Sequence, residues 1–202
     1  MIGIVDYGVG NVASVSNMLK RLGLESVRVS SSKAVAAVDR LILPGVGAFD
    51  AGMQALRRDG ELITALEERV LTDRVPFLGI CLGMQMLTSG SDEGREPGLG
   101  WVSGRAKRFG KDSGLKVPHV GWNSTTSGPG SKLLGGSQTP SRFYYVHSYY
   151  VEVDHNDGVT MTAEYGGDFC AGFERENVYG VQFHPEKSHR SGMQLLGNFA
   201  GL

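Results

Sequence analysis

The first half of the chain alternates between short strand-like runs and segments whose apolar residues recur every three or four positions. The runs have the length of buried strands and cover residues 1–5, 26–30, 40–45 (ended by Pro44) and 76–80. Helical spacing follows each run, at residues 11–23, 33–38, 49–70 (with an interruption near Gly60) and from Gly83 onward. This order predicts a parallel sheet with helices on both faces.

The second half consists mainly of β-type segments separated by Gly, Asn and Asp. These segments are residues 104–109, 142–153, 160–165, 169–175 and 178–184. They predict antiparallel strands added to the sheet, or a second small sheet. A hairpin turn is expected at Glu176–Asn177, a last helix at 191–202, and flexible loops at 89–100 and 124–140. The predicted fold is α/β, a central mostly parallel sheet flanked by helices with antiparallel strands in the C-terminal half, in a single domain spanning residues 1–202.

Composition and charge argue against a nucleic-acid-binding or membrane protein. The chain has 202 residues, with 20 Lys and Arg against 21 Asp and Glu, and this balance gives no electrostatic footprint for nucleic acid or anionic membranes. Cys81 and Cys170 lie in dissimilar contexts, which predicts no disulfide and a reducing, cytoplasmic setting. No apolar stretch is long enough to cross a bilayer. We therefore expect no nucleic-acid or membrane partner, no metal and no cofactor.

The stretch LGICLGMQ places a cysteine between two glycines where a strand ends and a helix begins. Gly79 and Gly83 would allow the tight turn of a nucleophile elbow, with the sulfur of Cys81 exposed at the carboxyl edge of the sheet. Backbone N–H groups at the start of the helix would stabilise a thiolate and an oxyanion. Because buried structural cysteines are common, this pattern alone leaves both interpretations open.

A thiol nucleophile needs a base, and the base needs a group that orients it. In the stretch GVQFHPEKS, His184 alternates with apolar residues and so points away from the apolar face of its strand. Glu186 would share that face if the extended conformation continued through Pro185. The sequence therefore predicts a triad of Cys81, His184 and Glu186. The alternative is an exposed histidine at a strand end and a solvated carboxylate.

The remaining histidines and the second cysteine are weaker candidates. His147, in a strand crowded with tyrosines, is the second choice as the base. His119 follows a proline and is assigned to a loop, while His155 and His189 lie in polar surroundings. Cys170 has no elbow around it and is expected in the core.

Two further glycine turns lie near strand ends. LPGVGAF follows the third strand at the same sheet edge, where its peptide around Val46 and Gly47 would present an N–H toward the sulfur. Together with the N–H of Leu82 this would form an oxyanion hole with two donors. Taken alone, the stretch fits an ordinary strand-to-helix turn better. DYGVGN lacks the spacing and the Lys-Ser/Thr of a phosphate loop, so it predicts no nucleotide site.

Six motifs together resemble the class I (triad) glutamine amidotransferase family over essentially the whole chain. They are DYGVGN, PGVGAF, GICLGMQ, PHVGWN, YYVHSYY and FHPEKS. The elbow and the His-Pro-Glu are shared across that family. The other four are similar to one branch, the glutaminase subunits of imidazole glycerol phosphate synthase, and DYGVGN and Lys187 are the most telling. Branches that make anthranilate or aminodeoxychorismate usually carry other residues after the cysteine and after His-Pro.

This resemblance implies a reaction and a partner. Cys81 would attack the carboxamide of L-glutamine, and the ammonia would pass to a separate (β/α)₈ cyclase subunit of the synthase in a heterodimer of histidine biosynthesis. The residues implied for the glutamine pocket are Gly45, Gln85, Ser148 and Tyr149. Those expected at the docking surface and ammonia entry are Lys187, Trp122 and Tyr144, with a surface lysine and core aromatics as the alternative.

Three other functions stay open on the sequence. The first is a glutaminase subunit of another amidotransferase, of the anthranilate, aminodeoxychorismate or pyridoxal phosphate synthase type. The second is a catalytically silent binding subunit, against which the intact triad speaks. The third is a hydrolase that uses the same elbow on esters or peptides. We also hypothesise that the glycine-flanked peptide before Val46 flips when the cyclase docks, so that glutamine hydrolysis by the lone chain is weak.

Overall fold

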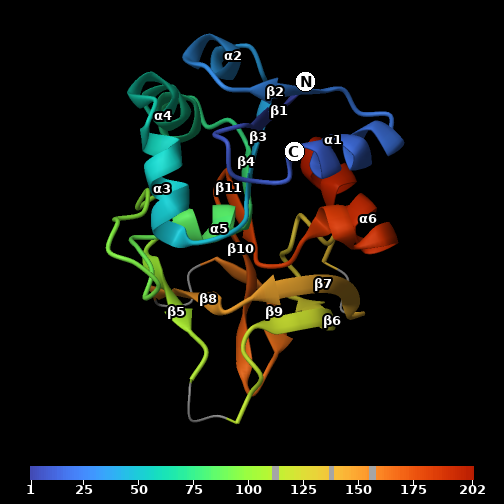
Figure 1. Ribbon diagram of the computed structural model, residues 1–202. Coiled ribbons are helices and arrows are strands. Elements are labelled where there is room, and N and C mark those ends of the chain that lie inside the picture. Colours follow the sequence, from blue (N-terminus) through green and yellow to red (C-terminus); the bar gives the residue numbers. More distant parts are fainter. Residues whose placement is uncertain (111–113, 137–138, 155–157) are drawn as a thin grey trace.

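The computed structural model describes residues 1–110, 114–136, 139–154 and 158–202. Within these ranges, eleven strands form one sheet in the order β2-β1-β3-β4-β11-β10-β9-β6-β7, and β5 and β8 extend it beside β10 (Figure 1). Neighbouring strands from β2 to β11 are parallel, and the other pairs are antiparallel. The predicted α/β fold, a parallel sheet extended by antiparallel strands, is confirmed.

The two parts of the sheet follow the two halves of the sequence with one exception. The parallel part contains β1 (Ile2–Val5), β2 (Ser26–Val29), β3 (Arg40–Gly45), β4 (Phe77–Cys81) and β11 (Val178–Val181). The antiparallel part contains β5 (Gly104–Arg108), β6 (His119–Ser127), β7 (Ser141–His147), β8 (Tyr149–Val153), β9 (Val159–Glu164) and β10 (Asp168–Arg175). The exception is β11, which the predicted hairpin turn returns to the middle of the sheet, parallel to β4.

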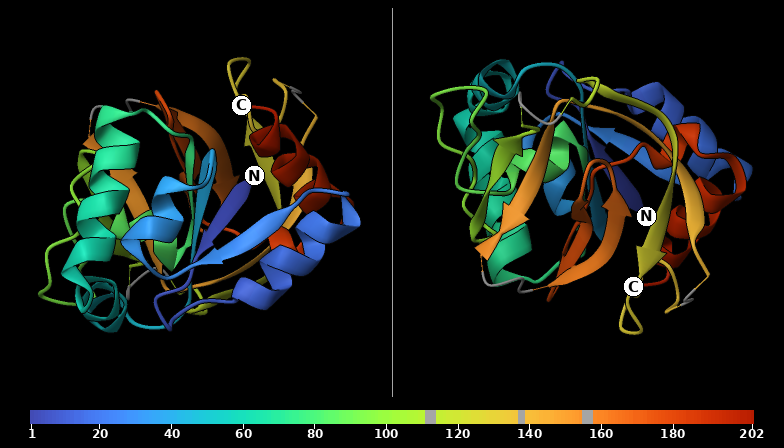
Figure 2. Two further views of the ribbon diagram at one scale, coloured as in Figure 1. Left: turned by 90° about the horizontal axis from the view of Figure 1, so that it is seen from above. Right: turned by 90° about the horizontal axis from the view of Figure 1, so that it is seen from below.

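Helices cover both faces of the parallel part (Figures 1 and 2). One face carries α1 (Val12–Arg21) and α6 (His189–Ala200), and the other carries α2 (Ser32–Ala36), α3 (Phe49–Arg57), α4 (Gly60–Glu67) and α5 (Leu82–Met86). In β1, Ile4 packs with α1 and α6 while Val5 packs with the other layer, as a continuous apolar run predicts. In the described ranges, no helix combines the length and apolar character that crossing a membrane requires.

Helix boundaries follow local signals in the sequence. Asn11 caps α1 by accepting a hydrogen bond from Ser14 N at 3.3 Å. Gly23, after the end of α1, has a φ of +72°. Asp59 caps α4 by accepting hydrogen bonds from the N–H groups of Glu61 and Leu62. The cap interrupts the long helical segment at Gly60, as expected. The segment ends in a π-helical turn, Glu68–Thr72.

The carboxyl ends of β3, β4 and β11 meet at one edge of the sheet. Gly45 lies opposite Cys81 in the β3–β4 ladder, and Val181 lies opposite Ile80 in the β4–β11 ladder. The prediction that Pro44 ends β3 is wrong, because the strand continues to Gly45. Proline lacks only the backbone N–H donor, and Pro44 still pairs with Ile80 of β4. The glycine turn, the elbow and the segment after β11 are therefore neighbours in space.

The segment 124–140, predicted as a flexible loop, is largely structured. Its first part belongs to β6, whose inward positions Thr125 and Ser127 are buried polar residues. Farther on, the Glu174 carboxylate accepts hydrogen bonds from Ser131 Oγ at 2.7 Å and Leu133 N at 3.1 Å. Two residues of the predicted loop, 137–138, lie outside the described ranges.

The segment 89–100 is also held in place. Asp50, in the first turn of α3, accepts hydrogen bonds from Arg95 N at 3.0 Å and Glu96 N at 2.9 Å. Backbone contacts tie the same segment to the start of β5. The prediction of a free loop is wrong here, because one carboxylate satisfies successive backbone donors.

Candidate active site

Cys81 lies on a strained turn between β4 and α5. Its φ of +55° and ψ of −110° are rare for a residue with a side chain, and such a conformation costs on the order of 1–3 kcal/mol. Glycines on either side let the turn close. A Cβ on Gly79 would lie 2.7 Å from the Gly83 oxygen, and a Cβ on Gly83 would lie 2.0 Å from the Leu43 oxygen. The turn has the geometry of a nucleophile elbow.

His184 and Glu186 come from the segment that follows β11. His184 Nδ1 lies 2.8 Å from Glu186 Oε1, and both side chains are only 2% exposed. The alternating pattern had suggested an extended backbone between them, and this expectation is wrong. Pro185–Lys187 form a 3₁₀ turn, which suits a proline at its first position and folds Glu186 back toward the imidazole ring. The predicted pairing of the two side chains is present, by a different backbone path.

Electrostatics favour a protonated His184. Burial lowers the pKa of this imidazole, but its interactions with Cys81 and Glu186 outweigh burial and raise the pKa to about 10. Its second ring nitrogen, Nε2, is buried with no hydrogen-bond partner among the described residues. This nitrogen is available to the thiol and to a substrate. The three side chains can therefore act as nucleophile, proton donor and orienting carboxylate.

A cavity of about 310 Å³ opens beside Cys81. Its lining includes the residues predicted for the oxyanion hole and, except Gly45, those predicted for the glutamine pocket: Val46, Gly47, Leu82, Gln85, Ser148 and Tyr149. Gly45 is not part of the lining. It packs under the elbow, where a Cβ would lie 2.6 Å from Gly83 N.

Glu93 also lines this cavity, and the sequence did not point to it. Its Oε2 accepts a hydrogen bond from Phe49 N at 2.8 Å, which fixes the carboxylate between the start of α3 and the cavity. An acidic side chain in the wall complements a substrate that carries a positive charge. A single Glu in a segment interpreted as a loop gives no pattern from which this position could be found.

The DYGVGN turn braces the end of β3. The Tyr7 hydroxyl donates to the Pro44 carbonyl oxygen at 3.1 Å, and a Cβ on Gly10 would lie 2.6 Å from the same oxygen. Burial, together with the nearby Cys81, raises the pKa of Tyr7, so the hydroxyl keeps its proton and donates. This motif supports the glycine turn at the cavity.

His147 and His119 form a buried pair on β7 and β6. His147 Nε2 lies 3.0 Å from His119 Nδ1, and His147 Nδ1 lies 2.9 Å from the Tyr149 carbonyl oxygen. Burial is the main cause that lowers the pKa of His147 to about 3. Both its nitrogens are engaged, which weakens its candidacy as the base. The loop assignment of His119 is wrong, since it begins β6. His155 lies outside the described residues.

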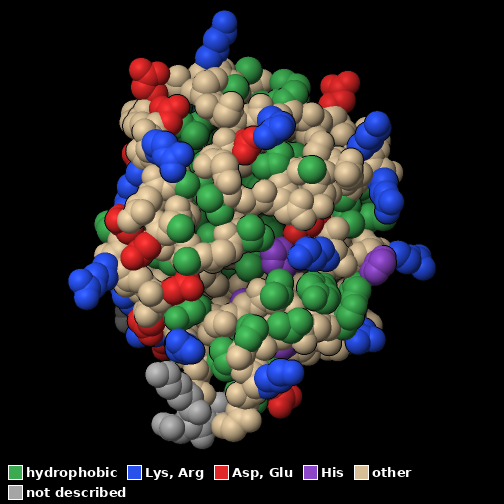
Figure 3. All heavy atoms as spheres, in the orientation of Figure 1, with side chains coloured by type: hydrophobic (Ala, Val, Ile, Leu, Met, Phe, Trp, Pro, Cys, Tyr) green, Lys and Arg blue, Asp and Glu red, His purple; other side chains and the backbone are tan. Residues whose placement is uncertain are grey.

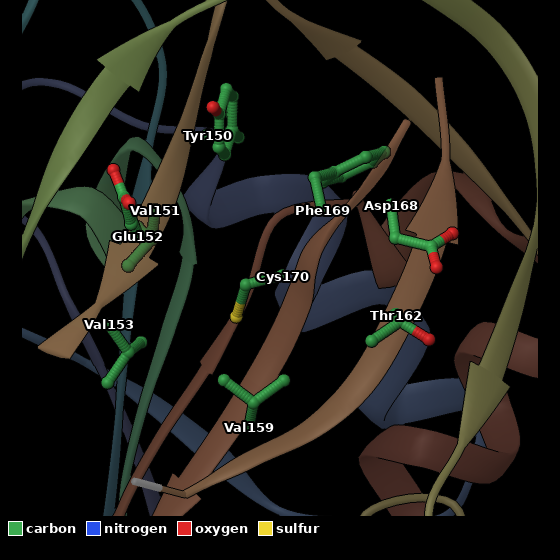
Figure 4. Close-up of a pocket in the computed structure, with 9 residues that line it drawn as sticks. All are labelled: Tyr150, Val151, Glu152, Val153, Val159, Thr162, Asp168, Phe169 and Cys170. Atoms are coloured by element: carbon green, nitrogen blue, oxygen red, sulfur yellow. The ribbon is translucent and has the colours of Figure 1, made fainter. Parts of the chain in front are cut away.

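Cys170 lies on β10 and lines a different cavity, of about 490 Å³, between β8 and β9 (Figure 4). Cys170 is 8% exposed, and burial raises the pKa of its thiol to about 12. Because the thiolate is the reactive form, Cys170 stays inert at neutral pH. This agrees with the prediction of a core cysteine.

The residues expected at a docking surface lie together. Trp122 and Tyr144 face each other across β6 and β7 with ring centroids 6.1 Å apart, and Lys187 Nζ lies 5.7 Å from the Tyr144 ring. We call this surface the β6–β7 patch; it comprises Val120, Trp122, Tyr144, Val146, Lys187 and His189. The expectation of polar surroundings for His189 is wrong, because its ring stacks on Trp122 with 5.3 Å between centroids. Trp122 is 41% exposed, so it is not a core aromatic. Figure 3 shows hydrophobic side chains gathered over β6 and β7 beside histidine and basic groups.

Comparison with known families agrees with this geometry. The model of the class-I glutamine amidotransferase family matches residues 3–201. The chain belongs to this family.

The individual relatives with high sequence identity include subunits of one synthase. The chain is 50% identical over 202 residues to imidazole glycerol phosphate synthase subunit HisH 2 of Pseudomonas aeruginosa, with all of both chains covered. It is 44% identical over 199 residues to subunit HisH 2 of the same synthase from Methanococcus maripaludis, with 98% of each chain covered. It is 44% identical over 205 residues to subunit HisH from Leptospira interrogans, with 100% of each covered.

Solved structures support the fold alone. A glutamine amidotransferase superposes with a TM-score of 0.78 at 20% identity, covering 100% of this chain and 99% of that one. PurLQS from Thermotoga maritima gives a TM-score of 0.75 at 18% identity, covering 99% of this chain and 97% of that one.

Proposed function

We propose that this chain is the glutaminase subunit of an imidazole glycerol phosphate synthase, hydrolysing L-glutamine to glutamate and ammonia for a cyclase subunit. The observation that carries the proposal is the meeting of Cys81, His184 and Glu186 at one sheet edge beside a cavity. Relatives that bear this subunit name match along their full length at 50% and 44% identity.

In the first half of the reaction the Cys81 thiolate attacks the carboxamide carbon of glutamine. The backbone N–H groups around Val46 and Leu82 stabilise the developing oxyanion. The protonated His184, held by Glu186, gives its proton to the departing nitrogen. Ammonia leaves and a γ-glutamyl thioester remains on the sulfur.

In the second half water replaces ammonia. His184, now neutral, takes a proton from the water as it attacks the thioester, and glutamate leaves as the sulfur returns to its starting state. Positioned proton transfer of this kind contributes about 10² to 10⁴-fold in rate. The α-ammonium group of glutamine faces Glu93, while Gln85, Ser148 and Tyr149 surround the rest of the molecule.

The cyclase docks on the β6–β7 patch. Val146 belongs to both the patch and the cavity lining, so the patch reaches the mouth of the site. Exposed apolar and aromatic groups beside one lysine suit a protein partner. The glycine turn around Val46, itself 41% exposed, lies at the same mouth, where docking can change its peptide orientation.

Reconstitution tests this proposal. The chain is mixed with a cyclase subunit of imidazole glycerol phosphate synthase, and glutamate release and glutamine-dependent cyclase product are measured with and without the cyclase ligand. We expect slow hydrolysis by the lone chain, faster hydrolysis in the loaded complex and product formation from glutamine. Activation by an anthranilate-type or pyridoxal phosphate-type synthase, with none by the cyclase, would assign the chain to another branch.

A further inference from the structure

Gln182 is a buried amide that the reaction described above does not use. It follows β11, it is 0% exposed, and its Nε2 lies 3.7 Å from Cys81 Sγ. Its Oε1 lies 3.1 Å from Gln85 Nε2. A buried amide is costly unless its donors and acceptor are paired, so this contact with the sulfur is part of a specified network.

One backbone carbonyl fixes the direction of these hydrogen bonds. The Tyr149 carbonyl oxygen can only accept, so the Gln85 group 3.1 Å from it is the NH₂. The same NH₂ reaches Gln182, which must present its oxygen there. Gln182 then turns its own NH₂ to Cys81. A flipped amide at either glutamine would bring two donors or two acceptors together.

The histidine pair holds that carbonyl in turn. Because the Tyr149 oxygen only accepts, His147 Nδ1 carries the hydrogen and donates at 2.9 Å. Burial lowers the pKa of both His147 and His119, so both rings are neutral. His147 Nε2 therefore accepts from His119 Nδ1 at 3.0 Å. Every donor is therefore assigned: the Tyr149 carbonyl oxygen accepts from His147 on one side and from Gln85 on the other, and Gln182 donates to the sulfur.

We propose that Gln182 is a catalytic residue whose side-chain N–H stabilises the Cys81 thiolate, and that Gln85 and His147 are positioning residues that hold it as a donor. This inference rests on the proposed glutaminase function. A hydrogen bond from an N–H to sulfur favours the thiolate over the thiol, because the anion is the stronger acceptor. Gln182 thereby increases the fraction of the enzyme that is ready to attack.

The test is the pH profile of Cys81 alkylation by iodoacetamide in the full-length chain, with Cys81→Ser giving the background from Cys170. Gln182→Glu keeps the shape but replaces the donor by an acceptor. We expect the midpoint of its profile to rise by about one pH unit or more, because one charge-assisted hydrogen bond is lost and a carboxylate is placed beside the thiolate. Alkylation at neutral pH would then be about tenfold slower.

A matched amide-to-acid control is Asn198→Asp, on α6. Asn198 Nδ2 donates to the Leu133 carbonyl at 2.9 Å, away from the cavity. This variant should keep the wild-type midpoint. An unchanged midpoint in Gln182→Glu overturns the assignment of Gln182. His147→Leu should shift the midpoint upward by less than Gln182→Glu does, and no shift there overturns the positioning role.

If Gln182→Glu does not fold, as judged by circular dichroism, Gln182→Leu takes its place. Leu has no N–H and adds no charge beside the sulfur, so a smaller upward shift is expected, caused by the lost hydrogen bond alone, and its absence is equally decisive. Alkylation needs no glutamine. A wild-type complex that hydrolyses no glutamine, together with the expected shifts, would contradict the proposed function and leave the N–H contact to the sulfur intact.

Discussion

At the scale of single residues, His184 is held between two groups that both favour its proton. Glu186 contacts Nδ1, and Cys81 lies close enough to raise the pKa of the ring despite burial. A buried pair of this kind is costly to break from one side, because the remaining charge loses its partner. The same pair that supplies the proton in the proposed reaction therefore also affects stability.

The raised pKa of His184 predicts how stability depends on pH. Because the folded-state pKa is about 10 against an ordinary value of 6.5, the stabilisation is fully present below about pH 6.5 and is lost as pH rises toward 10. In Glu186→Gln the raising effect of the carboxylate is gone. We expect the free energy of unfolding, measured by urea denaturation, to fall less steeply over that window than in the wild type. Identical slopes would show that Glu186 does not hold the proton.

At the scale of elements, the elbow depends on close contact between α5 and its neighbouring strands. Gly79 touches the first turn of the helix, and Gly83 touches the backbone of β3. These contacts bring the N-terminus of α5 to the sulfur. A side chain at either glycine would push the helix away from the sheet.

The same Gly→Ala substitution at two helix positions separates the effect of the close contact at the elbow from the effect of helix propensity. Gly83→Ala would place a Cβ 2.0 Å from a carbonyl oxygen, so we expect loss of folded protein or a large drop in melting temperature. Gly197, within α6, has no atom within 4 Å of a built Cβ. Gly197→Ala should stabilise the chain by about 0.5–1 kcal/mol. Thermal denaturation of both variants measures this, and equal effects would contradict the elbow geometry.

The segment 89–100 carries Glu93 into the cavity and is anchored at the start of α3. Asp50 binds two backbone N–H groups of this segment, and these bonds lower the pKa of its carboxyl group. Asp50→Ala should release the segment, so we expect KM for L-glutamine to rise several-fold with a smaller change in kcat.

Asp59→Ala is the control for this effect. It removes the cap of α4, where Asp59 Oδ1 accepts from Glu61 N at 3.0 Å and Leu62 N at 3.1 Å. It should cost about 1 kcal/mol of stability while leaving KM unchanged. An unchanged KM in Asp50→Ala as well would mean that Glu93 is placed without this anchor.

At the scale of the whole molecule, the two ends of the sheet have different surfaces. The edge strand β2 exposes Val27 (37%), whereas β6 exposes Val120 (56%) beside Trp122 near the cavity mouth. Only the second lies in an aromatic cluster. If the β6–β7 patch binds the cyclase, a charge placed there should act very differently from a charge on β2.

We therefore expect Val120→Asp to weaken cyclase binding at least tenfold, because it buries an unpaired carboxylate in the interface. Val27→Asp should bind as the wild type does. Titration calorimetry of each variant with the cyclase gives the comparison. Equal affinities for the two variants would place the partner elsewhere on the molecule.

Much of the fold could be predicted because its signals are local. The continuous apolar run of β1 predicts a buried strand, and Asn11 predicts the start of α1, because both depend only on residues close together in the sequence. The strand β6 was missed because it buries Thr125 and Ser127 instead of apolar residues, which removes the alternating pattern. The pairing of His184 with Glu186 was predicted, but its 3₁₀ path was not, since the alternating pattern before Pro185 suggested that the extended chain continued.

Within the candidate site, the sequence identified side chains that belong to recognisable motifs. Glu93 and the hydrogen-bond network of Gln182 could not be predicted from the sequence. Their roles depend on hydrogen bonds that involve distant backbone groups, such as Phe49 N and the Tyr149 carbonyl oxygen. No spacing along the chain indicates these contacts. Gln182 was visible only as a polar residue on the same strand face as His184.

The most direct measurement is covalent labelling by a glutamine-like diazo-ketone, with the modified residue located by mass spectrometry. We expect one label, on Cys81, slowed by excess L-glutamine, strongly reduced in His184→Ala and absent in Cys81→Ala. Labelling that falls on Cys170, or that L-glutamine does not slow, would contradict Cys81 as the nucleophile of a glutaminase.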